Sequence, residues 1–388
     1  MSELLMFIFW LSVLSVFHTY VLYPFYMIKR YGKRQPLRAT YHQSDEWPAV
    51  AILVAAYNEE KVIAEKIHSV FNTDYPLDKI RLLIGSDASS DKTDEIVSEL
   101  SKQYKNLQLI KFIGRVGKIS IVNELQSLCE EPILIMSDAN VIFTKQTISN
   151  LIQYFKDEEV GIVAANILKQ SLTSEGISLQ EKMYLSLENK VKAAESNAFD
   201  LIMGAEGGCY AIRNNLFSKV PSKFNVDDFY ITFQVLLKNK KVLFSTLAIC
   251  NEDVSGAIEG EYRRKVRISS GNFQNLFFFK NILYQFWKPF GFTFLSHKVL
   301  RWYTPFFIII CLASSAVLMM ETSFYKLLFL IQILFISLAF INSFLKIKNS
   351  LLKFITHFYF MNLALLHGFI KFSRGIKSSI WQPVDRNV

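Results

Sequence analysis

Apolar residues in this chain are gathered into long blocks near its two ends. The first block covers residues 4–28 and is interrupted by few polar residues, among them His18 and Thr19. Residues 302–320 and 324–345 form two more blocks, separated by a short turn. Each block is long enough to cross a bilayer as a helix, so we expect one N-terminal and at least two C-terminal transmembrane helices.

A further apolar segment, residues 351–370, allows two interpretations. His357, Asn362 and His367 weaken it as a span, although residues 354–370 are numerous enough to cross. A third C-terminal span would place the basic tail outside the cell, against the tendency of positive residues to stay inside. We therefore favour an interfacial helix with a cytoplasmic tail, and keep two to three C-terminal transmembrane helices open.

Between the blocks, residues 48–260 alternate short apolar runs with amphipathic helical patterns, which is typical of an α/β domain. The expected strands cover residues 50–55, 80–84, 107–112, 133–136 and 160–164, and the expected helices cover residues 59–72, 91–104 and 117–129. Such an alternation predicts a Rossmann-like, largely parallel sheet. Ligands bind beyond the carboxyl ends of the strands in these sheets, so the loops that follow the strands are the places to look for chemistry.

The distribution of charge favours a membrane protein with no nucleic-acid partner. Lys and Arg outnumber Asp and Glu by 43 to 34, and residues 28–38 and 262–302 are basic runs without any acid. Both runs flank apolar segments, as expected for contact with anionic membrane lipids. The first run orients the N-terminus outward and the α/β domain toward the cytoplasm, in a multi-pass protein of the cell membrane. The start MSELL has no basic residue, so a cleaved signal peptide fits poorly.

These patterns divide the chain into six segments. They are an N-terminal transmembrane helix (1–28), a basic linker (29–47), the α/β domain (48–260), a basic and aromatic interfacial segment (261–300), C-terminal transmembrane or interfacial helices (301–372) and a tail (373–388). A composition that is 51% hydrophobic and 20% charged excludes a disordered chain, and its separation into blocks excludes a purely soluble domain. The four cysteines have no metal-binding spacing and are expected to be reduced, buried thiols.

Polar residues follow the first two expected strands. Tyr57, Asn58 and Glu59 come after the first strand, and Asp87 comes at the end of the second. Taken alone, Asn58 is explained by helix capping. A carboxylate at the mouth of a parallel sheet, such as Asp87, is well placed to accept hydrogen bonds from a base or a ribose.

The third loop, residues 114–123, contains two glycines and two basic side chains. A phosphate-binding P-loop is excluded because two residues instead of four separate the glycines, and Ile119 replaces the required Ser or Thr. A flexible loop that brings Arg115 and Lys118 to an anionic ligand remains open.

The fourth loop places Asp138 and Asn140 one residue apart after a wholly apolar strand. Two oxygen-bearing side chains at this spacing can share a hard divalent cation, which then bridges phosphate oxygens. The preference of Asp and Asn for turns is an alternative explanation of these two residues. Four polar loops in order on one sheet edge are stronger evidence for a site than any one of them.

With these loops the chain resembles the membrane-integrated family 2 glycosyltransferases, the superfamily of cellulose and hyaluronan synthases, whose catalytic domain has a GT-A fold. The resemblance implies that Tyr57, Asn58, Glu59 and Asp87 embrace the uridine of a nucleotide sugar. From its place in the third loop we expect Lys118 to contribute to the same site. It also implies that Asp138 and Asn140 form the D-x-D metal motif for Mg²⁺ or Mn²⁺. Asn140 replaces the usual second Asp, so we expect weaker cation binding.

The resemblance further indicates a catalytic base. Family members use the second acid of a pair that opens a helix, which matches Asp227 and Asp228 and makes Asp228 the expected general base. The neighbouring charge raises the pKa of such a carboxylate. A double helix cap explains the same pair. Residues 204–213, ending in Arg213, resemble the glycine-rich acceptor segment of the family, although a buried turn explains these glycines equally well.

Residues 263–272 take the place of the family's Q-x-x-R-W motif. Arg267 matches the Arg of this motif, whereas Arg264 and Ile268 replace its Gln and Trp. We expect Arg264 and Arg267 to hold the diphosphate, because guanidinium groups suit phosphate oxygens, whereas the other basic residues of the run meet lipid headgroups equally well. The loss of the Trp puts the synthesis of a long polymer in doubt.

The function implied is an inverting glycosyltransferase that moves a sugar, expected to come from a UDP-sugar, to a polysaccharide or lipid-linked acceptor at the membrane, with a β-glycosidic product. The alternative is a catalytically inactive membrane scaffold or partner subunit with the same fold, favoured by Asn140 and the altered Q-x-x-R-W motif. A homodimer would enlarge a small transmembrane channel, but nothing in the sequence shows one.

Overall fold

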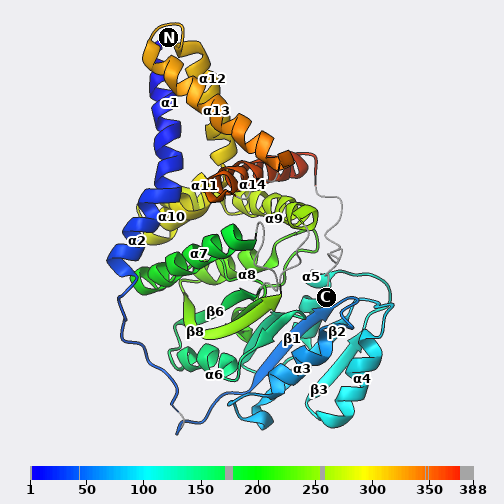
Figure 1. The fold of residues 1–388 in the computed structure, drawn as a ribbon. Helices are drawn as coiled ribbons and strands as arrows, with labels where there is room; N and C mark the ends of the chain where they lie inside the picture. Colours follow the sequence, from blue (N-terminus) through cyan, green and yellow to red (C-terminus); the bar gives the residue numbers. More distant parts are fainter. Residues whose placement is uncertain are drawn as a thin grey trace. The chain divides into compact units, whose positions relative to one another are not determined.

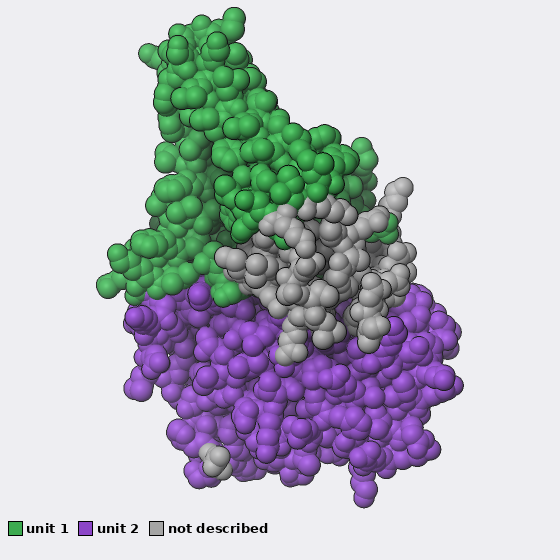
Figure 2. Space-filling model, viewed as in Figure 1, with its two compact units in different colours: residues 1–30, 173–188, 257–376 green, residues 31–172, 189–256, 377–388 purple. Residues whose placement is uncertain are grey.

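The computed structural model describes residues 2–42, 44–170, 178–253, 258–345, 347 and 349–375. The chain separates into two compact units, which Figure 2 shows in different colours. The first unit comprises residues 1–30, 173–188 and 257–376, and the second comprises residues 31–172, 189–256 and 377–388. Almost all of the expected tail, 373–388, lies outside the described residues.

The second unit is built on an eight-stranded sheet with the order β3-β2-β1-β4-β7-β6-β8-β5. Figure 1 labels β1, β2, β3, β6 and β8 of this sheet. Its strands are β1 (Val50–Ala56), β2 (Ile80–Ser86), β3 (Leu107–Lys111), β4 (Ile133–Asp138), β5 (Val141–Phe143), β6 (Val160–Gln170), β7 (Cys209–Arg213) and β8 (Lys241–Asp253). The parallel arrangement expected from the sequence is confirmed for β3, β2, β1 and β4. The whole sheet is mixed, because β7 runs antiparallel to both β4 and β6, and β5 antiparallel to β8.

Helices connect the parallel strands as the strand-helix alternation predicts. They are α3 (Ile63–Phe71), α4 (Thr93–Gln103) and α5 (Lys118–Ser127). Helices α6 (Thr147–Ile152) and α8 (Asp227–Leu237) precede β6 and β8, and short 3₁₀ turns lie at Leu77–Lys79, Gln153–Lys156 and Asn214–Leu216. The longer α7 (Ser178–Phe199) begins in the first unit and ends in the second. The central strand β1 reads VAILVAA without a polar residue because both of its faces are covered, and Ile52 and Val54 are completely buried.

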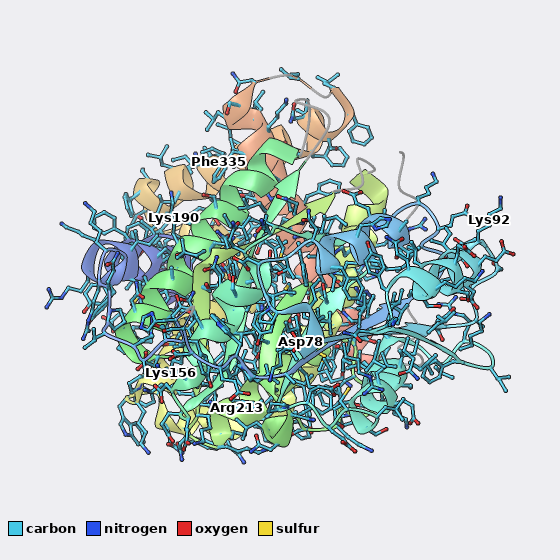
Figure 3. The ribbon with its side chains drawn as sticks, turned by 90° about the horizontal axis from the view of Figure 1, so that it is seen from below. Asp78, Lys92, Lys156, Lys190, Arg213 and Phe335 are labelled. Carbon is cyan, nitrogen blue, oxygen red and sulfur yellow. The ribbon has the colours of Figure 1, made fainter. Side chains whose placement is uncertain are left out.

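The register of the parallel strands brings their carboxyl ends to one edge of the sheet. Ala55 of β1 pairs with Gly85 of β2 on one side and with Asp138 of β4 on the other. The antiparallel β7 starts at this same edge, since Cys209 pairs with Ser137. The glycine-rich segment before β7 therefore reaches the edge that carries the polar loops. At the opposite edge lie Asp78, before β2, and Arg213, at the end of β7; Figure 3 labels both.

The first unit contains the apolar helices. Residues Ser2–Tyr31 form one helical segment, made of α1 (Ser2–Phe17), a π-helical turn (His18–Leu22) and α2 (Tyr23–Tyr31), that is long and apolar enough to cross a membrane. The same holds for α13 (Ser323–Leu345). Both expectations are confirmed by length and composition.

The block expected at 302–320 has a different form. Helix α12 (Thr304–Leu318) has 15 residues, too few to cross alone, and is preceded by helical residues Pro289–Trp302 at a bend of 61°. These comprise α10 (Pro289–Thr293), a π-helical turn (Phe294–Val299) and α11 (Leu300–Trp302). The bent pair is a broken span or a re-entrant loop, so the described residues contain two candidate spans, or three if the pair counts as one.

Helix α14 (Ser350–Ser373), the uncertain segment, packs along α9 (Ile258–Phe278), which carries the first part of the basic run. The Ser269 hydroxyl donates to the carbonyl of Leu365 at 3.0 Å. A Cβ on Gly368 would lie 2.3 Å from the side chain of Ser269, so this glycine is needed for the close approach. The length and apolarity that identify the candidate spans among the described residues do not extend to α14. The interfacial position of α14 stays a prediction.

A buried ionic cluster joins α7 to the bent helical pair inside the first unit. Glu188 pairs with Lys298 at 2.7 Å, with Arg301 at 2.7 Å and with His297 at 2.9 Å. Burial by itself would raise the pKa of Glu188, but the three basic groups outweigh it and hold this pKa well below its usual value. The glutamate therefore stays ionised and compensates cations that would otherwise be buried alone.

Candidate active site

Asp87 fastens the third loop to the edge of the sheet. Its carboxylate is buried, and Oδ1 accepts hydrogen bonds from the backbone N–H groups of Val116 at 2.6 Å and Gly117 at 3.1 Å. Nε of Arg115 donates to Oδ2 at 3.0 Å. Gly117 has a φ of +84°, a conformation that glycine adopts readily and that lets the chain enter α5 here. Asp87 thus orders the loop that carries both basic side chains singled out in the sequence.

Tyr57 forms an aromatic platform beside this carboxylate. The guanidinium of Arg115 lies 3.3 Å from the centre of the Tyr57 ring, a close cation–π contact. Tyr57, Arg115 and Asp87 come from three successive loops and lie together, as the loop order predicts.

Asn58 ties the first loop to the second. It has a φ of +54°, its side-chain oxygen accepts from the N–H of Ser90 at 2.8 Å, and its own N–H donates to Ser89 Oγ at 3.2 Å. Helix α3 starts only at Ile63, so the helix-cap explanation of Asn58 is wrong. Glu59 is buried, and its backbone N–H donates to Thr93 Oγ1 at 2.8 Å. Both residues act within the described structure by joining loops.

Lys118 and Asp138 form an ion pair at the centre of the edge. The lysine Nζ lies 2.6 Å from Oδ1 of Asp138, and both side chains stay partly exposed. Burial alone would lower the pKa of Lys118, but the charges of Asp138, Asp227 and Asp228 outweigh it and raise this pKa above its usual value. One lysine therefore lies within the electrostatic reach of both the expected metal motif and the expected base.

The residues expected to hold a metal ion fit a cation with few protein ligands. Asp138 ends β4 and Asn140 lies in the turn before β5, and they offer a carboxylate and an amide oxygen, which are ligands that Mg²⁺ and Mn²⁺ accept. Lys118 occupies Oδ1, which leaves the second carboxylate oxygen for a cation. Among the described residues no group of three or more His, Cys, Asp or Glu side chains forms a complete metal site. The remaining ligands of such a cation would be phosphate and water oxygens.

Asp228 lies in the first turn of α8, against the glycine-rich segment. Its Oδ2 accepts from the N–H of Gly207 at 2.6 Å and its Oδ1 from the N–H of Phe229 at 2.6 Å. Burial and the neighbouring charge of Asp227 raise its pKa to about 7, although Lys118 and the two hydrogen bonds act in the opposite direction. The helix cap is Val226, so the double-cap explanation of the acid pair is wrong. A carboxylate with this pKa can take up and release a proton near neutral pH.

Tyr210 is a site residue that the sequence analysis does not identify. It is buried on β7, and burial together with the charges of Asp227, Asp228 and Asp138 raises the pKa of its phenol well above the usual value. Its phenol group thus stays neutral among three carboxylates. The sequence analysis singles out the segment 204–213, which contains Tyr210, but not Tyr210 itself, because it is one of several apolar and aromatic residues there.

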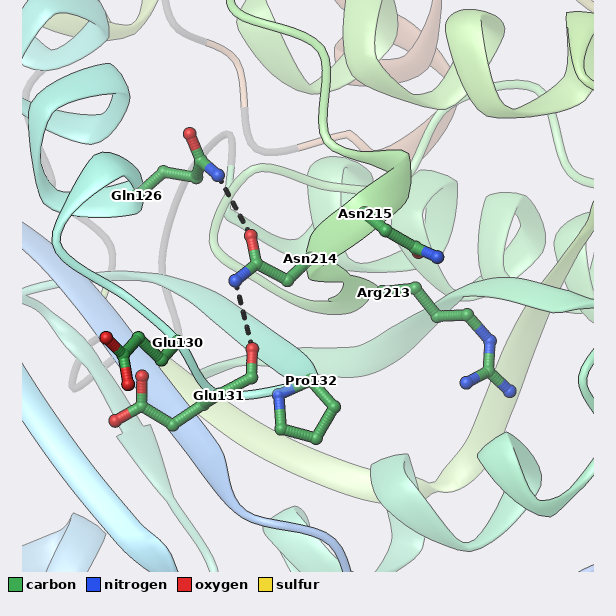
Figure 4. A pocket seen from close by; sticks show the side chains of 7 residues that line it. All are labelled: Gln126, Glu130, Glu131, Pro132, Arg213, Asn214 and Asn215. Carbon is green, nitrogen blue, oxygen red and sulfur yellow. Dashed lines mark hydrogen bonds between the residues drawn. The ribbon is translucent and has the colours of Figure 1, made fainter.

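Arg213 has a structural position away from these residues. Its guanidinium donates to the backbone carbonyls of Phe155, Asp157 and Val160 at 2.8–2.9 Å. It lines an open hollow of about 470 Å³ at the opposite edge of the sheet, together with residues that include Glu131 and Asn214 (Figure 4). This hollow is therefore separate from the candidate site, and Arg213 has a structural role there, in binding the backbone carbonyls that precede and begin β6.

Arg264 and Arg267 lie on α9, in the first unit, and their side chains are partly buried. The expectation that they hold a diphosphate stays a prediction.

Comparison with known proteins identifies relatives in both sequence and structure. Residues 51–220 match the model of "Glycosyl transferase family 2". The chain is 35% identical over 118 residues to a β-monoglucosyldiacylglycerol synthase of Trichormus variabilis, a stretch that covers 30% of this chain and only 25% of that protein. It is 24% identical over 307 residues to a poly-β-1,6-N-acetyl-D-glucosamine synthase of Staphylococcus epidermidis, covering 76% of this chain and 71% of that one.

A solved structure extends the likeness to almost the whole chain. The mannosyltransferase PcManGT of Pyrobaculum calidifontis, solved with GDP-Man and Mn²⁺, superposes with a TM-score of 0.70 at 19% identity, over 94% of this chain and 99% of that one. At this identity the comparison establishes a shared GT-A fold.

Proposed function

We propose that this chain, whose residues 51–220 belong to glycosyl transferase family 2, transfers a sugar from a nucleotide-sugar donor to a polysaccharide or lipid-linked acceptor at a membrane. The observation that carries the proposal is that a charged pair and a carboxylate that can act as a base lie at one edge of the sheet. Asp138 and Lys118 supply an anion and a cation suited to a diphosphate and its metal ion, and Asp228 supplies a carboxylate with a pKa of about 7.

The donor would bind across the first three loops. A nucleobase stacks on the Tyr57 ring, beside the carboxylate of Asp87 and the guanidinium of Arg115. We propose uridine as the base and a UDP-sugar as the donor. The ammonium of Lys118 would contact the diphosphate, because it is a partly exposed cation at the edge where the donor arrives.

The transfer proceeds by direct displacement. The acceptor hydroxyl oxygen forms a bond to the anomeric carbon while the bond from this carbon to the diphosphate oxygen breaks, and the hydroxyl proton passes to Asp228. Attack from the side opposite the leaving group inverts the anomeric centre and produces a β-linkage from an α-linked donor. A divalent cation on Asp138 and Asn140 would neutralise the charge of the departing diphosphate.

The acceptor is proposed from the relatives and the apolar helices. One relative is named for a glucosylated diacylglycerol and the other for a poly-N-acetylglucosamine chain. Two or three helices among the described residues have the length and composition of spans, which supports a multi-pass protein of the cell membrane. The basic run at residues 28–38, after the first of these helices, supports a cytoplasmic position of the catalytic domain.

The test is nucleotide release from a panel of UDP- and GDP-sugars by the detergent-purified chain, with Mg²⁺ or Mn²⁺ and native lipid extract. We compare the wild type with Asp228→Asn and with Asp78→Asn, an exposed acid at the opposite sheet edge (Figure 3). Cation-dependent release from selected donors, lost in Asp228→Asn and kept in Asp78→Asn, supports the transferase. Intact donors throughout, with the nucleotide still bound, would instead establish an inactive scaffold.

A further inference from the structure

A lysine that the proposed reaction does not use is completely buried behind the candidate metal turn. Lys66 lies on α3 with no exposed surface. Its ammonium donates to Ser137 Oγ at 2.7 Å and to the carbonyl oxygen of Val141 at 2.6 Å. It also lies 3.5 Å from the centre of the Phe143 ring. Burying a charged group is unfavourable unless it is paired or hydrogen-bonded, so these contacts must compensate for a large loss of hydration.

The two acceptors of Lys66 flank the turn that contains the expected metal ligands. Ser137 directly precedes Asp138, and Val141 directly follows Asn140. One ammonium therefore ties together the two ends of a turn only three residues long.

The same contact extends to the glycine-rich segment. The hydroxyl of Ser137, which accepts from Lys66, donates to the carbonyl of Gly208 at 3.0 Å. The backbone N–H of Asp138 donates to this carbonyl at 3.2 Å. Gly208 is adjacent to Gly207, whose N–H binds Asp228. A continuous chain of hydrogen bonds thus links Lys66 to the backbone on both sides of the site.

We propose that Lys66 is a positioning residue for the donor site: its buried ammonium holds the turn that presents Asp138 and Asn140 to the diphosphate and its cation. The inference rests on the proposed function, because it requires a nucleotide donor at this edge. Hydrogen bonds behind metal ligands commonly orient them, and their loss reduces metal affinity or activity by about 10–100-fold.

The charge that this role requires is present at neutral pH. Burial lowers the pKa of Lys66 to about 8, while the neighbouring Cys209, Cys250 and Asp138 act in the opposite direction. The amine is therefore mostly protonated at pH 7, and three N–H groups are available for its acceptors.

The test measures nucleotide binding directly on the full chain in detergent. UDP and GDP are each titrated calorimetrically at a series of Mn²⁺ concentrations. Lys66→Met keeps the length of the side chain and removes its charge and donors, and Ser137→Ala removes one of the two acceptors. Lys105→Met, on an exposed lysine, is the matched control. Unfolding temperatures are recorded for all variants.

We expect Lys66→Met to raise the Mn²⁺ concentration for half-maximal nucleotide binding by about tenfold or more. Ser137→Ala has a smaller effect in the same direction because the bond to Val141 remains, and Lys105→Met has none. If Lys66→Met does not fold, the Mn²⁺ dependence of nucleotide binding by Ser137→Ala is the test instead. If the tested variant folds and binds nucleotide like the wild type, the role of Lys66 is overturned, while the proposed function stands. Absence of binding by the wild type overturns the proposed function and the inference together.

Discussion

The ammonium nitrogen of Lys118 lies 2.6 Å from Oδ1 of Asp138, so a permanent cation stands beside the carboxylate expected to bind a divalent one. The charges of Asp227 and Asp228 also act on this lysine. Lys118 thus links the donor half of the site electrostatically to the base, and its removal should affect both.

Lys118→Gln should raise the donor KM by about tenfold, with a smaller change in kcat. A hydrogen bond between charged groups contributes roughly 1.5–3 kcal/mol, and partial exposure of this pair places it toward the lower end. The measurement is initial rate against donor concentration at saturating Mn²⁺. Lys102→Gln, on an exposed lysine of α4, should behave as the wild type. An unchanged donor KM in Lys118→Gln would exclude contact between Lys118 and the diphosphate.

The rate of transfer should rise with pH through about 7 and level off above it, because Asp228 must be unprotonated to accept the hydroxyl proton. Asp227→Asn removes a charge that raises the pKa of Asp228 and should move this limb to lower pH. Lys118→Gln removes a charge that lowers it and should move the limb to higher pH. The readout is kcat from pH 5 to 9 at saturating substrates. Identical profiles in all three proteins would rule out Asp228 as the titrating base.

Gly207→Ala should reduce kcat by about tenfold or more while nucleotide binding stays close to the wild-type value. A Cβ at this position would lie 2.9 Å from Oδ2 of Asp228, closer than real contacts allow, so the carboxylate or the segment must shift. A small misplacement of a catalytic group is enough for such a loss. Calorimetric UDP binding provides the internal control. A variant with normal kcat would show that the contact between Gly207 and Asp228 is dispensable.

Asp87→Asn should loosen the third loop and weaken nucleotide binding. The amide oxygen accepts less strongly than a carboxylate from Val116, Gly117 and Arg115. The amide NH₂ group, which replaces the second carboxylate oxygen, cannot accept from these donors at all. Amide hydrogen exchange at Val116 and Gly117 should become about tenfold faster, while exchange in the core strand β1 is unchanged. Asp78→Asn is the control for an exposed acid. Unaltered exchange at both amides would show that another contact orders the loop.

Glu188→Gln should lower the stability of the first unit by about 3–5 kcal/mol at pH 7, because Lys298 and Arg301 lose the charge that compensates them. The folded-state pKa of Glu188 is lowered, so its contribution is present above the unfolded-state value of about 4.3 and is lost as pH falls through the folded-state value. Unfolding temperatures in detergent at pH 7 and at pH 3–4 test this. The difference between the two proteins should shrink at the lower pH. Glu99→Gln, on an exposed glutamate, should match the wild type.

Much of the site follows from the order of residues along the chain. The strands β1, β2 and β4 are apolar over nearly their whole length because both faces are covered, and this makes them and the loops after them easy to locate. Parallel strands bring their carboxyl ends to one edge, so chain order alone predicts that Asp87 and Asp138 lie on the same side of the sheet.

Other parts of the site depend on pairing that local patterns do not reveal. Strand β7 inserts between β4 and β6 in the antiparallel direction and brings Tyr210 and the glycine-rich segment to the edge. The sequence analysis treats Asn58 as explained by a helix cap when taken alone, whereas Asn58 binds Ser90 across 32 residues. Short-range turn preferences cannot distinguish these outcomes, because both use the same side-chain oxygen.

Periodicity and chain order are enough to predict the α/β class, the apolar helices and the loops that hold Asp87 and Asp138, whereas Asp228 in the first turn of α8 is predicted only through the family resemblance. The burial of Lys66 cannot be predicted in this way, because in the sequence Lys66 looks like any other lysine of an amphipathic helix. Its ammonium is tolerated inside because Ser137 and Val141, 71 and 75 residues away, supply acceptors at the right distance. A charge can be buried only where distant segments together satisfy its hydrogen bonds, and such an arrangement exists only after the chain has folded.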